Sequence, residues 1–320
     1  MGIKQLNKII KNQCSESLTK VHFSSLKYKK LAIDISIYLY KFKMENTLIE
    51  SIYFMISLFR SYNIIPVFIF DGKPPAEKKE LLKQRKEKKQ DAEKRYNELQ
   101  EELKEDLSKE YEQYVLEEMD NEKKNFVKIK HYEIEEVKNL IRLYGVTYYD
   151  APGEAEELCA LLLKKNIVDG CVSEDMDLFL YGCSKVYRYL SLANSTMVCY
   201  NTKNILNDFN CSIEEFKLVC ILSGTDYYDF NVGNIYKCFH LFNKFSKLKK
   251  DETFYEWLQN NKIIDNTNDY VIDNIISMFD FSNIKNKLIN NKYICKNISY
   301  NNSQLKNFMK NYGFIYMNQQ

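Results

Sequence analysis

The chain has 320 residues, 45% of them hydrophobic and 28% charged, with a formal net charge of +2. This length and composition are typical of a globular protein with one large core or two modest ones, and no apolar run is long enough to span a bilayer. The charge is uneven: residues 1–95 hold 20 Lys and Arg against 10 Asp and Glu, whereas residues 96–122 hold 2 against 11. The small net charge therefore conceals a basic N-terminal part suited to binding phosphates.

The cysteine pattern argues against a zinc site. Nine Cys occur, none in a Cys-x-x-Cys pair, and the chain has three His. Unpaired thiols favour an intracellular, reducing compartment. No secretory signal peptide is recognisable, and the Met1-Gly2 start lacks the Ser or Thr at position 6 that myristoylation requires.

The first 75 residues predict a strand, a helix and a second strand. Residues 2–11 carry apolar side chains at helical spacing and predict a short amphipathic helix. An apolar strand over 31–35 contains Asp34, a helix follows over 51–62, and a second apolar strand over 66–70 ends at Asp71. This order favours a parallel sheet with a right-handed crossover.

Residues 76–144 contain neither Gly nor Pro and should be helical. Residues 78–95 are polar all round and mostly basic, so they should stand in solvent or meet a charged partner. From residue 96 onward an acidic helix should present one packed stripe, made of Leu99, Leu103, Leu107 and Tyr111. A third helix over 133–144 ends at Gly145. A solvated charged hairpin, or a coiled coil with a partner, is the alternative for this segment.

Beyond Gly145 a strand is predicted over 146–149, then a turn at 151–153 and a helix over 154–165. Residues 185–190 and 196–200 predict an antiparallel pair. Ser212 and Glu215 form a capping box for a helix ending at Gly224. The remainder predicts short helices, with a domain boundary near residue 205.

Acidic residues follow three of these strands. The sequence Val172-Ser-Glu-Asp-Met-Asp177 comes directly after an apolar run, as Asp71 does, and Asp34 lies within another. In extended chain Asp175 and Asp177 would point the same way. Carboxyl ends of parallel strands meet at one sheet edge, where like charges need cations to balance them. Oxygen ligands without thiolate or imidazole favour Mg²⁺ or Mn²⁺. For any one Asp alone, a helix cap, a turn residue or a surface charge is the simpler interpretation.

Five separated motifs resemble the flap endonuclease family of structure-specific 5′ nucleases, also called XPG-type. They are Met1–Lys4, Phe70–Pro75, Ala151–Glu156, Ser173–Asp177 and Ile221–Tyr227, and the resemblance runs from residue 1 to about residue 245. Each metal-site carboxylate of the family has a match, namely Asp34, Asp71, Glu154, Glu156, Asp175, Asp177 and Asp226.

The resemblance implies an α/β fold with a mainly parallel central sheet flanked by helices, a helical arch over the active site and a helical C-terminal part. It implies two Mg²⁺ ions per site, which Mn²⁺ is expected to replace. By resemblance Asp71, Glu154 and Glu156 serve mainly one ion, Asp175, Asp177 and Asp226 serve the other, and Asp34 acts through bound water. Residues two apart on a helix do not share a face, so Glu154 must lie at the very start of its helix.

The resemblance also assigns contacts with DNA. Lys78 and Arg85 match residues at the base of the arch, where they would act on the scissile phosphate and count as catalytic with Asp34. Tyr40 matches an aromatic residue that stacks on a base, and a buried core Tyr is the alternative. Gly2 matches the small residue that lets DNA approach closely, and Lys128 is a further expected contact.

The chain departs from the family in four places, and one of them is the arch segment after Lys73, which is longer and unusually acidic in its second half. The interval between Asp34 and Asp71 is short, which favours a reduced wedge loop. The family's duplex-binding Gly-x-Gly turn, part of a helix-turn-helix around residues 225–245, retains Gly233, with Lys237 nearby. Asn231 and Asn234 tolerate a left-handed backbone there. Leu305, Phe308 and Met309 match the family's sliding-clamp motif only poorly. A last packing helix over 305–314 is the preferred interpretation of this segment.

Together these observations predict a nuclease core over residues 1–205, with the arch over 76–130, and a helical part over 206–320. The expected activity is metal-dependent hydrolysis of branched or 5′-ended DNA in replication or repair. A 5′ exonuclease or gap nuclease of the same family and a non-catalytic DNA-binding relative are the alternatives. The protein is expected to be a monomer, away from membranes, in a nucleus or at a site of viral DNA replication.

Overall fold

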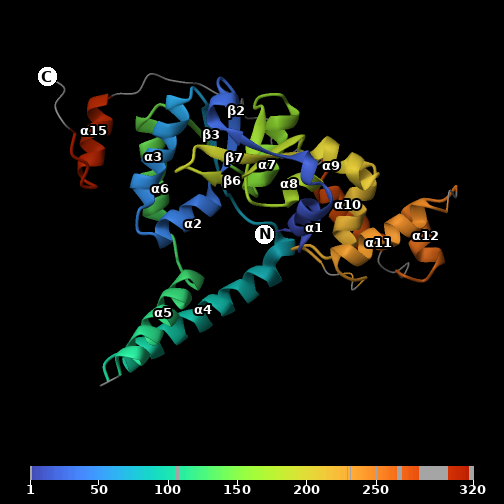
Figure 1. The fold of residues 1–320 in the computed structure, drawn as a ribbon, viewed down its shortest axis with the longest axis horizontal. Helices are drawn as coiled ribbons and strands as arrows, with labels where there is room; N and C mark the ends of the chain where they lie inside the picture. Colours follow the sequence, from blue (N-terminus) through green and yellow to red (C-terminus); the bar gives the residue numbers. More distant parts are fainter. Residues whose placement is uncertain are drawn as a thin grey trace. The chain divides into compact units, whose positions relative to one another are not determined.

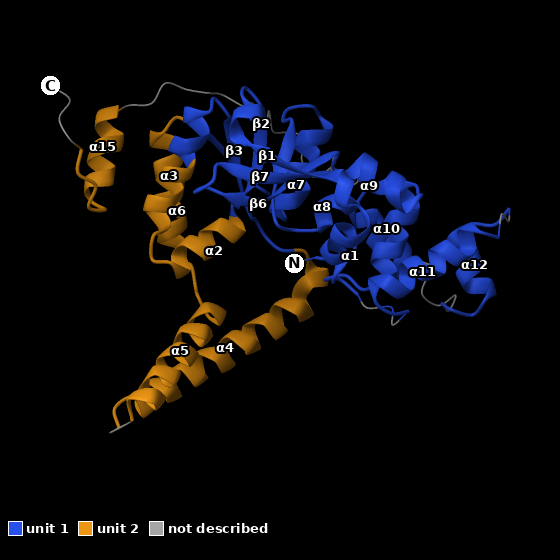
Figure 2. Ribbon diagram, in the orientation of Figure 1, with its two compact units in different colours: residues 1–35, 56–74, 146–298 blue, residues 36–55, 75–145, 299–320 orange. Residues whose placement is uncertain are grey.

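The computed structural model of the chain describes residues 2–105, 108–228, 230, 232–248, 251–264, 269–280 and 302–316. It divides into two compact units (Figure 2). Unit 1 comprises residues 1–35, 56–74 and 146–298, and unit 2 comprises residues 36–55, 75–145 and 299–320. The domain boundary near residue 205 stays a prediction.

A seven-stranded sheet forms the centre of unit 1, in the order β1-β7-β6-β5-β2-β3-β4 (Figure 1). The strands are β1 (Leu18–His22), β2 (Lys30–Asp34), β3 (Ile65–Phe70), β4 (Thr147–Asp150), β5 (Gly170–Val172), β6 (Lys185–Ser191) and β7 (Thr196–Asn201). Strands β6, β5, β2, β3 and β4 are parallel to one another, while β7 pairs antiparallel with both β6 and β1. The mainly parallel sheet and the antiparallel pair at 185–200 are therefore confirmed.

Helices flank this sheet, as predicted. Those of unit 1 are α1 (Leu6–Gln13), η1 (Ser15–Ser17), η2 (Phe23–Leu26), α7 (Ala155–Lys164), α8 (Asp177–Leu180), α9 (Thr202–Phe209), α10 (Ile213–Leu222), α11 (Ile235–Ser246), α12 (Phe254–Asn260) and α13 (Asp269–Met278). Helix α7 packs on β2, β3 and β5 and is buried along most of its length. Helix α3 (Leu48–Ser61) connects β2 and β3, and its predicted apolar face is fully buried, from Ile52 to Phe59. In β2 and β3 every residue after the first is buried, so both faces of these central strands are covered.

Three elements differ from the sequence expectation. Helix α1 begins at Leu6 rather than Gly2, because Gly2 and Gln5 have positive φ angles of 72° and 62°. Strand β1 was not predicted, since it lies at the sheet edge and none of its residues is fully buried. Helix α2 (Ser36–Met44), directly after β2, was not predicted either.

Unit 2 is built from helices: α2, η3 (Ala76–Lys78), α4 (Lys79–Glu102), α5 (Lys109–Asn125), α6 (His131–Leu143) and α15 (Asn302–Lys310). Helices α4 and α5 pack side by side as a hairpin (Figure 1). The predicted stripe from Leu99 to Tyr111 on one helix is wrong. Helix α4 ends at Glu102, and the Ser108 side chain accepts a hydrogen bond from the Tyr111 backbone N–H to start α5. Leu99 is buried and Tyr111 exposed, while Leu107 lies outside the described residues.

The C-terminal helices begin with the predicted capping box. Ser212 Oγ accepts a hydrogen bond from the Glu215 backbone N–H at 3.2 Å, and the Glu215 carboxylate accepts one from the Ser212 N–H at 2.8 Å. Helix α15 packs on α6 and buries Leu305 and Met309, which favours a packing helix there. The clamp motif and the helix-turn-helix stay predictions.

Among the described residues, no helix is long and apolar enough to cross a membrane.

Candidate metal and nucleic-acid site

Three neighbouring strands of the sheet end together at one edge. Asp34 closes β2, Asp71 directly follows β3, and the loop Ser173–Asp177 follows β5. The pairing register places Asp34 opposite Ile69 and Ile33 opposite Val172, so all three ends lie at the same level. The sequence prediction that three strands bring Asp to one edge is confirmed.

A chain of hydrogen bonds connects the acids of β2 and β5. Ser173 Oγ donates to Asp34 Oδ2 at 2.8 Å and accepts from the Asp175 backbone N–H at 3.0 Å. Asp175 Oδ1 in turn accepts from the Asp177 N–H at 3.0 Å. Asp34, Asp175 and Asp177 are 4%, 6% and 0% exposed, so three carboxylates are desolvated within one short stretch of sheet edge.

The prediction that Asp175 and Asp177 point the same way because they lie in extended chain is wrong. Strand β5 ends at Val172, and Asp177 is the first residue of α8. The two residues are therefore not part of one extended strand with side chains on the same side. Instead, the Asp175 side chain caps the N–H of Asp177.

Gly2 lies against these two carboxylates. A Cβ at Gly2 would stand 2.3 Å from Asp177 Oδ1 and 2.5 Å from Asp175 Oδ1, and the φ angle of 72° also favours glycine. Any larger residue would displace the acids or the backbone. The close approach of the two carboxylates thus explains why residue 2 is a glycine, while contact of Gly2 with DNA stays a prediction.

The acids of β3 and α7 form the second part of the site. Asp71 Oδ1 accepts a hydrogen bond from the Ala155 backbone N–H at 2.8 Å, so Asp71 caps the start of α7. Glu154 is the N-cap residue with extended backbone (φ −82°, ψ 148°), and Glu156 is buried in the first turn. Glu154 therefore lies outside the helix, as the proposed pairing with Glu156 requires.

Tyr227, the residue after Asp226, donates a hydrogen bond from its hydroxyl to Glu154 Oε2 at 2.9 Å. Burial raises the pKa of Tyr227 far above its usual value, and the phenol of Tyr181 and the carboxylates of Glu154 and Asp177 raise it further. Burial likewise raises the pKa of Tyr181, with Glu156 and Glu157 adding to the effect. Desolvation is thus the main cause of both raised pKa values, and the neighbouring carboxylates add to it.

The donor chemistry of this edge fits Mg²⁺ or Mn²⁺. The buried oxygens belong to carboxylates and one serine hydroxyl, which are ligand types that hard divalent cations prefer. As the side chains stand, no three of the His, Cys, Asp and Glu residues in the described ranges are arranged to hold an ion. The fold brings the acids to one edge, and their assignment as metal ligands stays a prediction.

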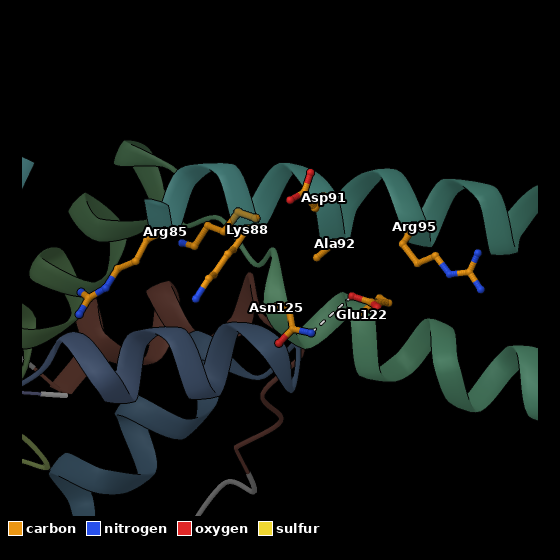
Figure 3. Close-up of a pocket in the computed structure, with 8 residues that line it drawn as sticks. Arg85, Lys88, Asp91, Ala92, Arg95, Glu122 and Asn125 are labelled. Carbon is orange, nitrogen blue, oxygen red and sulfur yellow. Dashed lines mark hydrogen bonds between the residues drawn. The ribbon is translucent and has the colours of Figure 1, made fainter. Parts of the chain in front are cut away.

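The predicted arch residues belong to unit 2. Lys78 ends η3 and is buried, while Arg85 is exposed on α4. Arg85 lines a cavity of about 630 Å³ between α4 and α5, together with Lys88, Lys89, Asp91, Ala92, Arg95, Glu122 and Asn125. Figure 3 shows Arg85 and Lys88 extending from α4 and Asp91 pointing away from Asn125 on the facing helix. Lys88 and Lys89 were not predicted as site residues, although the basic run from 83 to 89 contains them.

Tyr40 is 45% exposed, so the alternative of a buried core tyrosine is wrong. The Lys89 ammonium lies 5.1 Å from the centroid of the Tyr40 ring. Tyr40 and Lys89 line a second cavity, of about 340 Å³, with Lys41, Lys124, Asn125, Ile37, Met44 and Val127. An exposed aromatic ring among lysines suits contact with single-stranded nucleic acid.

Among the other predicted DNA contacts, Lys128 and Lys237 are exposed and Gly233 is partly exposed. Lys128 forms an ion pair of 2.6 Å with Glu93, and their side chains are 62% and 41% exposed. Gly233 has φ 142°, and a Cβ there would meet Lys237 Cδ at 2.5 Å. Asn234 is extended (φ −73°) and caps α11 by accepting from the Lys237 N–H, so it is not left-handed. Asn231 lies outside the described residues.

Comparison with known proteins identifies the family. The chain matches the XPG N-terminal domain over residues 1–92 and the XPG I-region over residues 145–226. A protein of Invertebrate iridescent virus 6 named "Probable RAD2-like endonuclease 369L" is 32% identical over 291 residues, 74% of this chain and 68% of that protein. Flap endonuclease 1 of Glycine max is 34% identical over 248 residues, which are 72% of this chain and 62% of that protein, less than two thirds of its length.

Solved structures agree in fold. The catalytic core of Rad2 in complex with DNA substrate has a TM-score of 0.68 at 20% identity, covering 97% of this chain and 94% of that one. Flap endonuclease-1 from Methanococcus jannaschii has a TM-score of 0.51 at 21% identity, covering 92% and 97%. Family models, relatives and fold agree with the sequence resemblance. The chain therefore belongs to the XPG-type flap endonuclease family of structure-specific 5′ nucleases.

Proposed function

We propose that this chain is a divalent-metal-dependent nuclease that hydrolyses phosphodiester bonds in branched DNA at a 5′ flap or 5′ end. The observation that carries the proposal is the set of buried acids at one sheet edge, where Ser173 joins Asp34 to Asp175. Desolvated carboxylates at such density are unfavourable unless cations balance them. Solved structures of the same fold include complexes of Rad2 with DNA substrate and of human GEN1 with Holliday junction DNA, which supports DNA, including branched DNA, as the ligand.

Two Mg²⁺ ions, or Mn²⁺ in their place, are the proposed cofactors. Asp71, Glu154 and Glu156 would hold one ion, Asp175, Asp177 and Asp226 the other, and Asp34 would act through water. When bound, such ions supply an activated water nucleophile and charge stabilisation at the phosphate. The position of Glu154 outside α7 supports its pairing with Glu156.

The hydrogen bonds around these acids would give the site its orientation. Ser173 fixes Asp34, the Ala155 N–H fixes Asp71, and Tyr227 fixes one oxygen of Glu154. Carboxylates held in this way lose less freedom when they bind an ion, and partners of this kind commonly affect metal affinity about 10-fold to 100-fold.

The basic helix α4 would contribute to DNA binding and to catalysis. Arg85 and Lys88 line the cavity between α4 and α5, and Tyr40 and Lys89 line the second cavity. We propose that these groups hold phosphates and bases of single-stranded DNA, with Lys78 and Arg85 acting on the scissile phosphate. Gly2, Lys128, Gly233 and Lys237 are proposed as further DNA contacts.

Two alternatives remain distinct. A 5′ exonuclease or gap nuclease of the same family is favoured by the short interval between Asp34 and Asp71. A non-catalytic DNA-binding relative is disfavoured, because all seven acids of the family motif are present. We propose that the protein is a monomer in a reducing compartment, in a nucleus or at a site of viral DNA replication. A contact with a sliding clamp has little support.

The experiment is cleavage of end-labelled flap, nicked and blunt duplexes with Mg²⁺ or EDTA. Flap cleavage that depends on Mg²⁺ is expected. Preference for the nicked or blunt duplex would favour the exonuclease alternative. DNA binding without cleavage of any substrate would favour the non-catalytic alternative.

A further inference from the structure

A buried arginine lies behind the acidic loop. Arg188 on β6 is 5% exposed and extends both ends of its guanidinium to partners distant in sequence. Its Nη1 donates to Asn7 Oδ1 at 2.6 Å, and its Nη2 donates to the Glu174 carbonyl oxygen at 2.9 Å. Nη2 also lies 3.3 Å from the Glu174 carboxylate. Arg188 is thus a bridge between α1 and the loop after β5.

On the loop side, the bridge holds the residue between Ser173 and Asp175. Arg188 binds both the backbone oxygen and the carboxylate of Glu174, and the same carboxylate accepts a hydrogen bond from the Tyr189 backbone N–H. Glu174 is therefore anchored to β6 at three points. Because Asp175 is the next residue, the position of this anchor fixes where the acids of the loop begin.

On the other side, the bridge holds α1 through Asn7. Asn7 Oδ1 accepts from Arg188 and from the Tyr200 hydroxyl at 2.9 Å, and Asn7 Nδ2 donates to the Tyr189 hydroxyl at 2.6 Å. Helix α1 continues from the segment that contains Gly2, whose missing Cβ makes room for the carboxylates of Asp175 and Asp177. Arg188 therefore ties together the two segments that meet at these acids.

The chemistry of this bridge requires arginine. The guanidinium carbon lies 5.3 Å and 5.4 Å from the ring centroids of Tyr189 and Tyr200, so its charge also interacts with two aromatic rings. A guanidinium has donors at fixed angles and can bind Asn7 and Glu174 at once, whereas the ammonium of lysine is a single point charge. Loss of the charge would leave the Glu174 carboxylate, which is 20% exposed, without its ion-pair partner.

We infer that Arg188 is a positioning residue for the proposed metal site, because it sets the loop Ser173–Asp177 and the Gly2 segment at a fixed separation. This inference rests on the proposed function. Arg188 is buried and its guanidinium is bound to Asn7 and Glu174, so its loss should reduce metal affinity and leave the affinity for DNA unchanged. Groups that orient metal ligands typically affect metal affinity about 10-fold to 100-fold.

The test measures Mn²⁺ binding directly, by following the electron paramagnetic resonance signal of free Mn²⁺ during titration of the full chain. Arg188→Met removes the charge from a side chain of similar length. Arg188→Lys keeps a positive charge but lacks the two guanidinium donors that bind Asn7 and Glu174 at once. Asn7→Ala removes only the hydrogen bonds that hold α1. The matched control is Asp169→Asn. Asp169 precedes β5 at its other end, where it accepts from the Lys30 N–H at 2.8 Å and from Lys29 Nζ at 3.1 Å. Thermal unfolding of each variant reports folding.

Arg188→Met should weaken Mn²⁺ binding by about 10-fold or more, Arg188→Lys should fall between it and the wild type, and Asp169→Asn should bind as the wild type does. If Arg188→Met does not fold, weaker Mn²⁺ binding by folded Asn7→Ala supports the inference. Wild-type Mn²⁺ affinity in folded Arg188→Met or Asn7→Ala would overturn it while leaving the proposed function intact. If the wild type neither binds Mn²⁺ nor cleaves a flap, the proposed function is wrong, and the role inferred for Arg188, which rests on it, is wrong as well.

Discussion

Ser173 Oγ donates a hydrogen bond of 2.8 Å to Asp34 Oδ2 and so joins the carboxyl ends of two parallel strands, β5 and β2. The same oxygen accepts from the Asp175 backbone N–H, which places one small hydroxyl between two of the proposed metal-site acids. Ser173 is itself fully buried. The hydroxyl thus orients Asp34 and holds the turn toward Asp175.

Ser173→Ala should raise the Mg²⁺ concentration that gives half-maximal cleavage, by about 10-fold, because Asp34 and the Asp175 turn lose their common partner. The measurement is a Mg²⁺ titration of the single-turnover rate on saturating flap. Ser17→Ala is the matched control, since Ser17 is also buried and donates to a carboxylate, that of Asp208. An equal Mg²⁺ requirement in both variants would contradict the role of Ser173.

Gly2→Ala should lower the cleavage rate at saturating DNA, because the new Cβ would stand 2.3 Å from Asp177 Oδ1. Gly182→Ala is its control: the φ angles are 72° and 69°, and a Cβ at Gly182 has no neighbour closer than 3.8 Å. Both variants carry a similar backbone strain of about 1 kcal/mol. Equal cleavage rates in the two variants would show that contact with the acids does not matter.

Lys78→Ala and Arg85→Ala should each slow the chemical step by about 100-fold or more while weakening DNA binding little. Each is one of many basic residues, so the salt slope of binding should change by about one unit. Single-turnover rates on pre-bound flap decide, with Lys94→Ala, an exposed lysine further along α4, as the control. Wild-type rates in both variants at saturating DNA would limit these residues to attracting DNA.

Activity should respond little when K⁺ is replaced by Na⁺ or Li⁺ at constant ionic strength. The duplex-binding turn retains Gly233, while Val232 and Ile235 beside it are buried in the core and Asn234 caps α11. The residues of this turn thus pack in the core and cap α11, which leaves fewer backbone groups to bind a cation. Flap cleavage and DNA affinity are measured in the three salts, since phosphate binding itself depends on ionic strength. A clear preference for K⁺ in both would contradict this prediction.

Sequence patterns predicted the elements whose residues are buried in regular fashion. Strands β2 and β3 are apolar runs, and α7 begins after a Pro-Gly turn, so their positions and the three acidic strand ends followed from spacing. Strand β1 escaped prediction because an edge strand has no buried run. The turn between α4 and α5 escaped because Leu99 and Tyr111 keep a helical spacing across it by coincidence.

The interior of the site depended on contacts that spacing does not encode. Asn7 and Arg188 are 181 positions apart, and Ser173 and Asp34 are 139 apart. Asp175 and Asp177 come together through a side-chain cap, although strand periodicity had suggested a different reason. Sequence could therefore name the acids, while their orientation required the fold.

The most direct test of the account is Asp177→Ala. Asp177 is fully buried at the start of α8, beside Gly2 and Asp175. Losing a metal ligand should remove several kcal/mol of transition-state stabilisation, whereas losing a negative charge should not weaken the binding of a phosphate backbone. Single-turnover cleavage of a 5′ flap with Mg²⁺ and DNA affinity are measured on the same folded preparation. Cleavage should be abolished and DNA affinity kept, and turnover close to that of the wild type would contradict the assignment of Asp177 as a metal ligand.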